Sequence, residues 1–111
     1  MDENECIFEV IDYRGKSVVF TKAKWAEKKA DHFELEKKAF IECLKRAISN
    51  PDEVWEDYSD RRYRRCYYKK YSSISYAKVV VWIGDGPCNV ITAYEISQIK
   101  EAKYPDLRRV R

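Results

Sequence analysis

The chain has 111 residues, of which 45% are hydrophobic and 37% charged, with only three glycines and three prolines. That length suits one domain with a core of its own, and the apolar fraction excludes intrinsic disorder. No apolar run approaches the roughly 18 residues of a membrane span, and the acidic start Met1–Glu5 lacks the pattern of a secretory signal. We therefore expect one cytoplasmic domain over residues 1–111, with a flexible basic tail from about residue 104.

Charge is divided unevenly along the chain. Residues 1–60 hold 10 Lys/Arg and 15 Asp/Glu, a net of −5, and residues 61–111 hold 12 and four, a net of +8, which gives +3 in all. The basic half favours a surface that binds a polyanion. Attraction between the two halves, or separate solvated faces, explains the division equally well, so charge alone leaves these readings open.

The first half of the chain predicts a hairpin followed by two helices. Residues 6–11 and 17–20 are strand-like and flank a turn at 12–16, and Thr21 is suited to cap a short helix over 22–30. Asn50 and Pro51 end the second helix, because proline forces the preceding residue out of helical geometry. The apolar stripe of that helix comprises Leu35, Ala39, Phe40, Cys43, Leu44, Ala47 and Ile48.

The second half predicts strands, because apolar residues now recur at a period of two. The predicted strands are 53–57, 61–71, 77–83 and 88–95, with a turn at 84–87. The apolar run within 77–83 indicates a central strand that is buried on both faces. This order of elements predicts an α+β fold, in which the N-terminal hairpin and two helices pack on one face of a four-stranded antiparallel sheet. The other face would be partly open to solvent.

The strand 61–71 is rich in tyrosine and cationic residues on both of its faces. Tyrosine rings that stack on bases, with Arg and Lys on phosphates, would make it a nucleic-acid surface. An amphipathic edge strand with cations that reach into solvent is the alternative. One face carries Tyr63, Arg65, Tyr67, Lys69 and Tyr71, and the other Arg62, Arg64, Cys66, Tyr68 and Lys70. Neither face is purely apolar, so the pattern does not say which one packs inward.

His32 is the only histidine, and it lies between the two predicted helices. A lone histidine is more often a capping or packing residue than a catalyst, yet imidazole is the group best suited to proton transfer near neutral pH. Glu34 follows it closely. Thr92 and Tyr94 share one face of the last strand and would look out across the open face, although both are also ordinary strand formers.

The four cysteines, Cys6, Cys43, Cys66 and Cys88, are never spaced as a close ligand pair. With one histidine in the chain, a zinc site is not indicated, and we expect thiols buried in a reducing cytosol. The sequence suggests no cofactor.

Three short segments follow one another along the chain: His32-Phe33-Glu34-Leu35, Asn50-Pro51-Asp52 and Thr92-Ala93-Tyr94. In this order and spacing they resemble the phage-type members of the barnase–EndoU–colicin–RelE superfamily of ribonuclease domains. The resemblance runs over about residues 10–96.

The resemblance implies a compact barnase/RelE-like fold and metal-free RNA cleavage by attack of the 2′-hydroxyl on the adjacent phosphate. His32 would then be the general base or acid, with Thr92 and Tyr94 lining the site. Among the cations, Arg64, Arg65 or Lys69 would stabilise the phosphate on chemical grounds. The full set of expected residues is catalytic His32, Thr92, Tyr94, Arg65 and Glu34, and RNA-binding Arg62, Arg64, Tyr67, Tyr68 and Lys69. The implied partners are RNA and an antitoxin or immunity protein, as for a toxin or toxin-like effector.

Two positions depart from the family pattern. Family members often have a second histidine where this chain has Glu27, and a proline where it has Phe33. The second proton-transfer role would then fall to Glu27, Glu34 or Tyr94, or the domain has kept its fold and only binds RNA or protein. A structural or inhibitor-like protein whose acidic half docks a basic partner is a third reading. The oligomeric state stays open.

Overall fold

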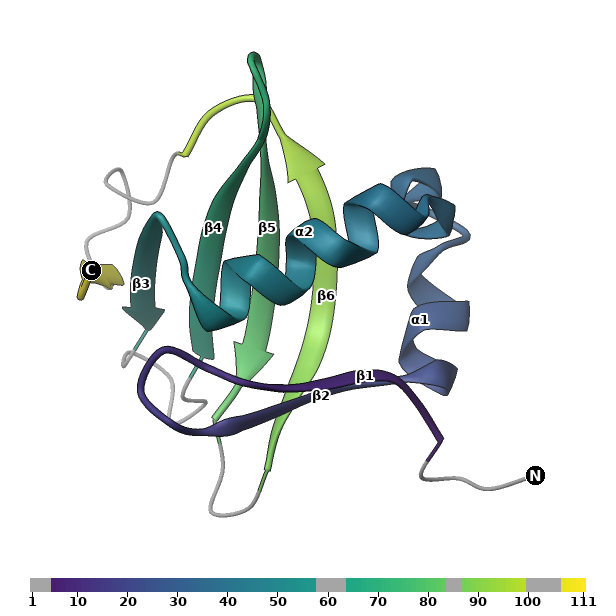
Figure 1. Cartoon of the computed structure of the whole chain (residues 1–111), viewed down its shortest axis with the longest axis horizontal. Coiled ribbons are helices and arrows are strands. Elements are labelled where there is room, and N and C mark those ends of the chain that lie inside the picture. The colour runs from purple at the N-terminus through teal and green to yellow at the C-terminus, as the bar shows by residue number, and fades with distance from the viewer. Residues whose placement is uncertain (1–4, 58–63, 84–86, 100–106) are drawn as a thin grey trace.

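The computed structural model describes residues 5–57, 64–83, 87–99 and 107–111, in which one face of a large sheet is crossed by a helix (Figure 1). In chain order the elements are β1 (Cys6–Ile11), β2 (Ser17–Thr21), α1 (Lys22–Lys28), the 3₁₀ helix η1 (Phe33–Glu36), α2 (Lys38–Ser49), β3 (Glu53–Asp57), β4 (Arg64–Ser72), β5 (Ser75–Trp82), β6 (Cys88–Ile96) and β7 (Leu107–Arg109). Of the described helices, none is long and apolar enough to cross a membrane.

The sheet corrects the expected fold. Its order is β1-β2-β6-β5-β4-β3-β7, so it has seven strands rather than four, and it is mixed rather than antiparallel, because β2 pairs with β6 in parallel. The α+β class holds. The predicted hairpin forms and crosses the sheet on the side of α2, as expected, but Val18 and Val19 of β2 also join the sheet by pairing with β6 (Figure 1). The reason is that a two-stranded hairpin is marginal alone, and joining an existing edge satisfies the backbone groups of both partners.

The hairpin turn uses side-chain and backbone bonds centred on Asp12. The Asp12 carboxylate accepts from the backbone N–H of Arg14 at 2.9 Å and of Lys16 at 2.8 Å, and the Asp12 N–H donates to the Lys16 carbonyl at 2.7 Å. Gly15 has φ +93°, a value that side chains rarely allow. The turn is tied to α2 as well, since Tyr13 N–H donates to the Ile48 carbonyl at 3.2 Å.

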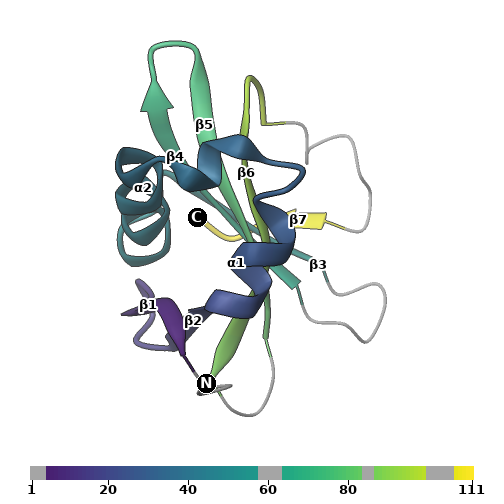
Figure 2. The same cartoon turned by 90° about the vertical axis from the view of Figure 1, so that its right-hand side faces the viewer.

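The apolar stripe of α2 builds the core against β4 and β5, as its spacing predicts (Figures 1 and 2). Ala39, which was expected in the stripe, is exposed instead. Leu35 belongs to η1 rather than to the long helix, yet it is also fully buried. The helix expected at residues 22–30 forms as α1, which makes its main contacts with the hairpin and β6, and its Trp25 packs against the same core. The core residues on α2 are Phe40, Cys43, Leu44, Ala47 and Ile48.

Two parts of the second half, the strand β5 and the C-terminal segment, also differ from expectation. β5 is a central strand, but only one of its faces is fully buried, so the prediction of burial on both faces is wrong. Residues 107–111, part of the expected tail, pair with β3, and Val110 N–H donates to the Val54 carbonyl at 2.8 Å. Arg62, most of the predicted turn at 84–87 and the segment 100–106 lie outside the described residues.

Candidate active site

The strands β4, β5 and β6 turn alternate side chains away from α2, and we call this side of the sheet the far face. On β5, Ala77, Val79 and Val81 are buried in the core that α2 covers. Tyr76 and Lys78 point to the opposite side and are half-buried. Figure 2 shows α2 on one side of β4 and β5, and Figure 1 shows α1 beyond β6 rather than behind these two strands. The far face therefore offers partly accessible aromatic and cationic side chains.

A row of three residues crosses the far face from strand to strand. Pairing registers place Tyr68 beside Lys78, and Lys78 beside Tyr94. The Lys78 ammonium lies 5.6 Å from the centre of the Tyr68 ring and 5.5 Å from that of Tyr94, within cation–π range of both. Tyr68 is fully buried, whereas Lys78 and Tyr94 are half-buried. A cation is thus held between two rings at the middle of the sheet.

His32 completes this row from outside the sheet. Its ring stacks on that of Tyr94, with ring centres 5.0 Å apart and planes inclined by 17°. His32 is half-buried and follows α1, and its backbone N–H donates to the Lys28 carbonyl at 3.0 Å. The histidine, the tyrosine and the lysine that approach each other here come from three separate parts of the chain.

Two hydrogen bonds hold the His32 segment against the sheet. The indole N–H of Trp25 on α1 donates to the Leu35 carbonyl at 2.8 Å, and Glu34 Oε2 accepts from the Glu95 backbone N–H on β6 at 2.8 Å. Glu34 thereby satisfies a backbone donor of β6 beyond the short stretch that pairs with β2. Its carboxylate is occupied with positioning η1, the turn that directly follows His32.

Thr92 lies on the far face one row away from Tyr94. It pairs with Val80, whereas Val81 pairs with Val90, so Ile91 is the extra residue of a β-bulge. The next residue, Ala93, is fully buried in the core. Thr92 and Tyr94 lie on one side together, as the alternation of the strand predicted, and the bulge at Ile91 lets Val90 face the core with Ala93.

Arg64 occupies the far face four residues along β4 from Tyr68, about 13 Å away at strand spacing. Its register neighbour on β5 is Trp82, which is 44% exposed. The Arg64 Nε atom is buried and has no hydrogen-bond partner among the described residues. This residue can serve a phosphate at the margin of the His32–Tyr94 row but does not belong to it.

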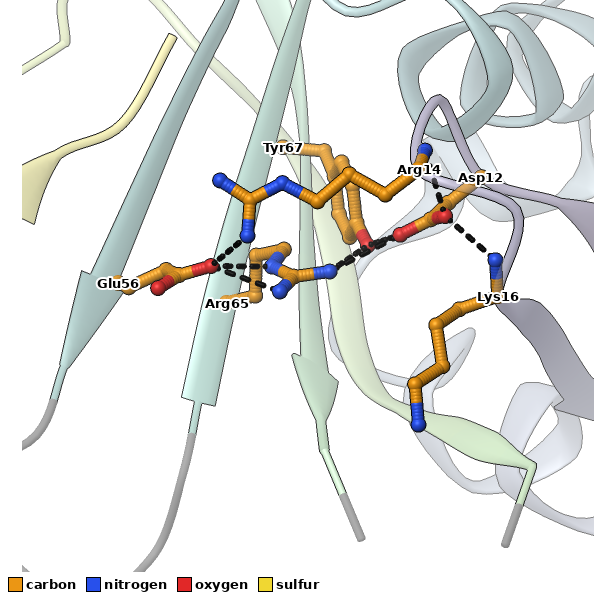
Figure 3. A network of polar contacts seen from close by, with 6 residues as sticks. All are labelled: Asp12, Arg14, Lys16, Glu56, Arg65 and Tyr67. Carbon is orange, nitrogen blue, oxygen red and sulfur yellow. Dashed lines mark hydrogen bonds and ion pairs between the residues drawn. The ribbon is translucent and has the colours of Figure 1, made fainter. Parts of the chain in front are cut away.

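Arg65 points to the opposite side, into a buried network under the hairpin turn (Figure 3). Its guanidinium donates to Glu56 Oε1 at 2.8 Å and to Asp12 Oδ2 at 2.9 Å. The Tyr67 hydroxyl donates to the same Asp12 oxygen at 2.7 Å, and Arg14 reaches Glu56 at 3.1 Å from the solvent side. The network joins the hairpin to β3 and β4.

The network fixes the protonation of its members. Burial raises the pKa of the Tyr67 hydroxyl well above its ordinary value, and the hydrogen bond that this hydroxyl donates to Asp12 adds to the increase. Burial works against the charge of Arg65, but its bonds to Tyr67 and Glu56 outweigh burial and raise the pKa of Arg65. Tyr67 is therefore a neutral donor and Arg65 a permanent cation. Neither lies with His32.

Two expected residues remain, Lys69 and Arg62. Lys69 is on the side of α2, where its ammonium donates to the Asn50 carbonyl at 2.9 Å and pairs with Asp52 at 3.3 Å. Arg62 lies outside the described residues. The far face thus gathers His32, Thr92, Tyr94, Tyr68 and, at a distance, Arg64, but not Arg65, Tyr67 or Lys69.

Lys78 is the functional candidate that sequence reasoning missed. It directly precedes the apolar run Val79-Val80-Val81, which indicated a strand that is buried on both faces. Residues at a period of two share one face of a strand, so Lys78 lies on the same face as Tyr76 and Trp82. That face carries polar and aromatic residues, which was the signal that it is not fully buried. A central strand that carries a charged residue needs one face where solvent or polar groups stabilise that charge.

Glu27, at the position where family members often have a histidine, is 59% exposed on α1. Its carboxylate accepts from Lys24 at 3.2 Å and pairs with Lys28 at 3.7 Å. The hydrogen bond and charge of Lys24 lower the pKa of Glu27. It is therefore an anion near neutral pH and a poor proton donor.

The cysteines and the possible metal ligands lie as follows. Cys43, Cys66 and Cys88 are buried and Cys6 is exposed, and all four are thiols. Burial raises the pKa of the Cys43 thiol. Within the described residues, no group of three His, Cys, Asp or Glu side chains is arranged to hold a metal ion.

Comparison with known protein families identifies a match over nearly the whole chain. The family model described as phage-Barnase-EndoU-ColicinE5/D-RelE like nuclease2 matches residues 4–111, nearly the whole chain. Among curated proteins and among solved structures, no significant match is found.

Proposed function

The chain belongs to the phage-Barnase-EndoU-ColicinE5/D-RelE like nuclease2 family, and from that premise we propose that it is a metal-independent endoribonuclease with its active site on the far face. A nuclease family indicates nucleic acid as the substrate class. The observation that carries the proposal is the stacking of His32 on Tyr94, with Lys78 over the same ring.

In the proposed reaction, the RNA 2′-hydroxyl gives its proton to His32 as its oxygen attacks the adjacent phosphorus. The bond from phosphorus to the 2′-oxygen forms, the bond to the 5′-oxygen breaks, and the 5′-oxygen takes a proton from a second group. The products are a 2′,3′-cyclic phosphate and a 5′-hydroxyl. A positioned general base of this kind contributes about 10²–10⁴-fold to the rate.

Lys78 supplies the positive charge that the pentacovalent phosphate requires. A cation aimed at the place where negative charge develops stabilises the transition state more than the ground state. The rings of Tyr68 and Tyr94 attract the Lys78 ammonium from both sides and so favour its position at the row. Thr92, one row away, lines the same surface with a hydroxyl that can bind phosphate or sugar.

The second proton-transfer role falls to Tyr94. Glu27 is exposed and kept anionic by Lys24, and Glu34 is engaged with the backbone of β6. Lys78 is needed as a fixed charge at the phosphate. Tyr68 is fully buried, so the hydroxyl of the half-buried Tyr94 is the remaining accessible donor of the row. We assign to it the proton that the leaving 5′-oxygen takes up.

Cleavage of total RNA by the purified protein, with and without EDTA, tests the proposal. We expect EDTA-resistant fragments with cyclic phosphate ends, and losses of about 10²-fold or more in His32→Ala and Lys78→Met. Tyr94→Phe keeps the ring and removes only the hydroxyl, so it separates the proton donor from the stacking surface. Lys45→Met, on the outer side of α2, is the matched charge control and should cut normally. Intact RNA at high concentrations of the wild-type protein refutes the enzyme assignment.

The presence of a single histidine, with an exposed Glu27 in place of a second one, favours one other function. In that case the domain binds RNA on the same far face without cutting it. Binding would weaken steeply with salt, as phosphate contacts do. Salt-dependent binding with no cyclic phosphate ends distinguishes this function from the enzyme, and binding that is indifferent to salt excludes its RNA form.

We extend the proposal to a toxin or toxin-like effector that acts in the cytoplasm and is restrained by an inhibitor protein. An endoribonuclease made inside a cell has that cell's RNA as its first substrate, so its producer needs a restraint. Induced expression in a bacterial host checks this: growth should stop with the wild type and continue with His32→Ala. Equal growth of both strains at equal protein levels contradicts the toxin assignment.

A further inference from the structure

A cavity of about 480 Å³ lies at one end of the far face, beside the turn between β4 and β5. Its walls include Glu53, Lys70, Ser73, Tyr76, Ser97 and Gln98. None of them belongs to the His32–Tyr94 row. The cavity adjoins that row, because Tyr76 stands two residues before Lys78 on β5, about 7 Å away at strand spacing.

Glu53 gives the cavity an oriented acceptor. Its Oε1 accepts from the Trp55 indole N–H at 2.7 Å and lies 3.9 Å from the Arg109 Nε. These two contacts hold the carboxylate in place. Glu53 is only 20% exposed. Its second oxygen makes no bond to the described residues. An acceptor fixed at the wall of a cavity selects ligands that present N–H or O–H donors.

Lys70 and Tyr76 bring the other two groups that a nucleotide needs. The Lys70 ammonium lies 4.9 Å from the centre of the half-buried Tyr76 ring. An aromatic ring stacks on a base, and an ammonium binds a phosphate. The volume falls within the range of about 300–1,000 Å³ that small-molecule sites occupy.

We propose that this cavity is a base-recognition subsite, which takes the nucleotide next to the scissile phosphate and prefers guanine to uracil. The proposal rests on the endoribonuclease function proposed above for its place in the substrate. Guanine presents an N1–H and an exocyclic amino group side by side, which match a carboxylate. Uracil presents one N–H between two carbonyl oxygens, which repel it.

Titration of the wild-type protein with guanosine 5′-monophosphate and uridine 5′-monophosphate, followed by NMR, tests the recognition directly. We expect saturable binding of the guanosine nucleotide that is about tenfold or more tighter than that of the uridine nucleotide. Glu53→Gln keeps an acceptor for the Trp55 indole but replaces the free acceptor by a donor, so the preference should disappear. Lys45→Gln, on the outer side of α2, should leave both affinities unchanged.

Absence of guanosine nucleotide binding up to 10 mM (about the weakest interaction of interest at this site) overturns the subsite. Equal affinities for the two nucleotides, or an unaltered preference in Glu53→Gln, do the same. Cleavage of matched oligoribonucleotides with guanine or uracil beside the cut is measured in parallel. RNA that is cut without base preference removes the subsite and leaves the endoribonuclease, whereas nucleotide selection without any cutting removes the endoribonuclease and leaves the subsite as a nucleotide site.

Discussion

Replacing Arg65 by methionine should destabilise the protein strongly while leaving its chemistry intact. The side chains of Asp12 and Glu56 are 0% and 3% exposed, and Arg65 is the cation that bonds to both. Removing one partner of a buried ion pair costs about 3–5 kcal/mol, because the other charge stays buried without compensation. For a chain of this size that is a fall in Tm of roughly 12–25 °C. Methionine fills similar space, so the cost reports charge rather than a cavity.

Arg14→Met is the matched control for that experiment. Arg14 contacts the same Glu56 oxygen at 3.1 Å, but its side chain is 43% exposed. A solvent-exposed cation in a salt bridge contributes about 0–1 kcal/mol, so this variant should unfold close to the wild type. The contrast between two arginines on one carboxylate isolates the effect of burial.

Urea titrations at pH 7, followed by circular dichroism, give the free energies of unfolding. RNA cleavage, measured well below the Tm of the variant, should stay within about threefold of wild type, since Arg65 does not touch the transition state. A deficit below about 1 kcal/mol, or a loss of cleavage as deep as that of Lys78→Met, refutes the structural role.

Three further predictions follow from single contacts. The raised pKa of Tyr67 means that its contribution to stability is complete below the ordinary tyrosine pKa of about 10 and is lost as pH rises above it. Tyr67→Phe should therefore flatten the alkaline fall in stability, and a parallel fall in both proteins contradicts the assignment. Gly15→Ala should cost about 1 kcal/mol in urea unfolding through backbone strain at φ +93°, and Gly15→Asn less, because asparagine tolerates this region. Glu34→Ala should reduce kcat for RNA several-fold with less than about 1 kcal/mol of destabilisation, whereas the exposed neighbour in η1, Glu36→Ala, should leave kcat unchanged.

Local periodicity and capping predicted the elements whose signals lie within one stretch of chain. The apolar stripe of α2, the β1–β2 hairpin and the Thr21 cap, whose hydroxyl accepts from Lys24 N–H at 3.1 Å, belong to this group. The proximity of His32 and Tyr94 came from the family resemblance and not from periodicity. No pattern within either segment links the two.

What the sequence could not predict depends on partners that are distant in the chain. The sequence did not show which face of β4 packs inward, because each face carries a buried polar residue. Arg65 is buried in an ion network, and Tyr68 is buried with Lys78 over its ring. Burial of Arg65 depends on Asp12, 53 positions earlier. The parallel pairing of β2 with β6 likewise has no local signature. Edge strands look alike in sequence until their neighbours are known.

The short parallel pairing has a consequence for the order in which the protein folds. Val18 and Val19 meet Cys88 and Asn89, residues about 70 positions away, whereas β4, β5 and β6 are joined to each other by short connections. Contacts between distant segments pay more chain-closure entropy and form later. We expect the hairpin to dock after the β4–β6 meander has formed, with φ-values near zero at Val18 and higher ones at Val79. The strands that carry Tyr68, Lys78 and Tyr94 would then be assembled before the N-terminal strands close the sheet.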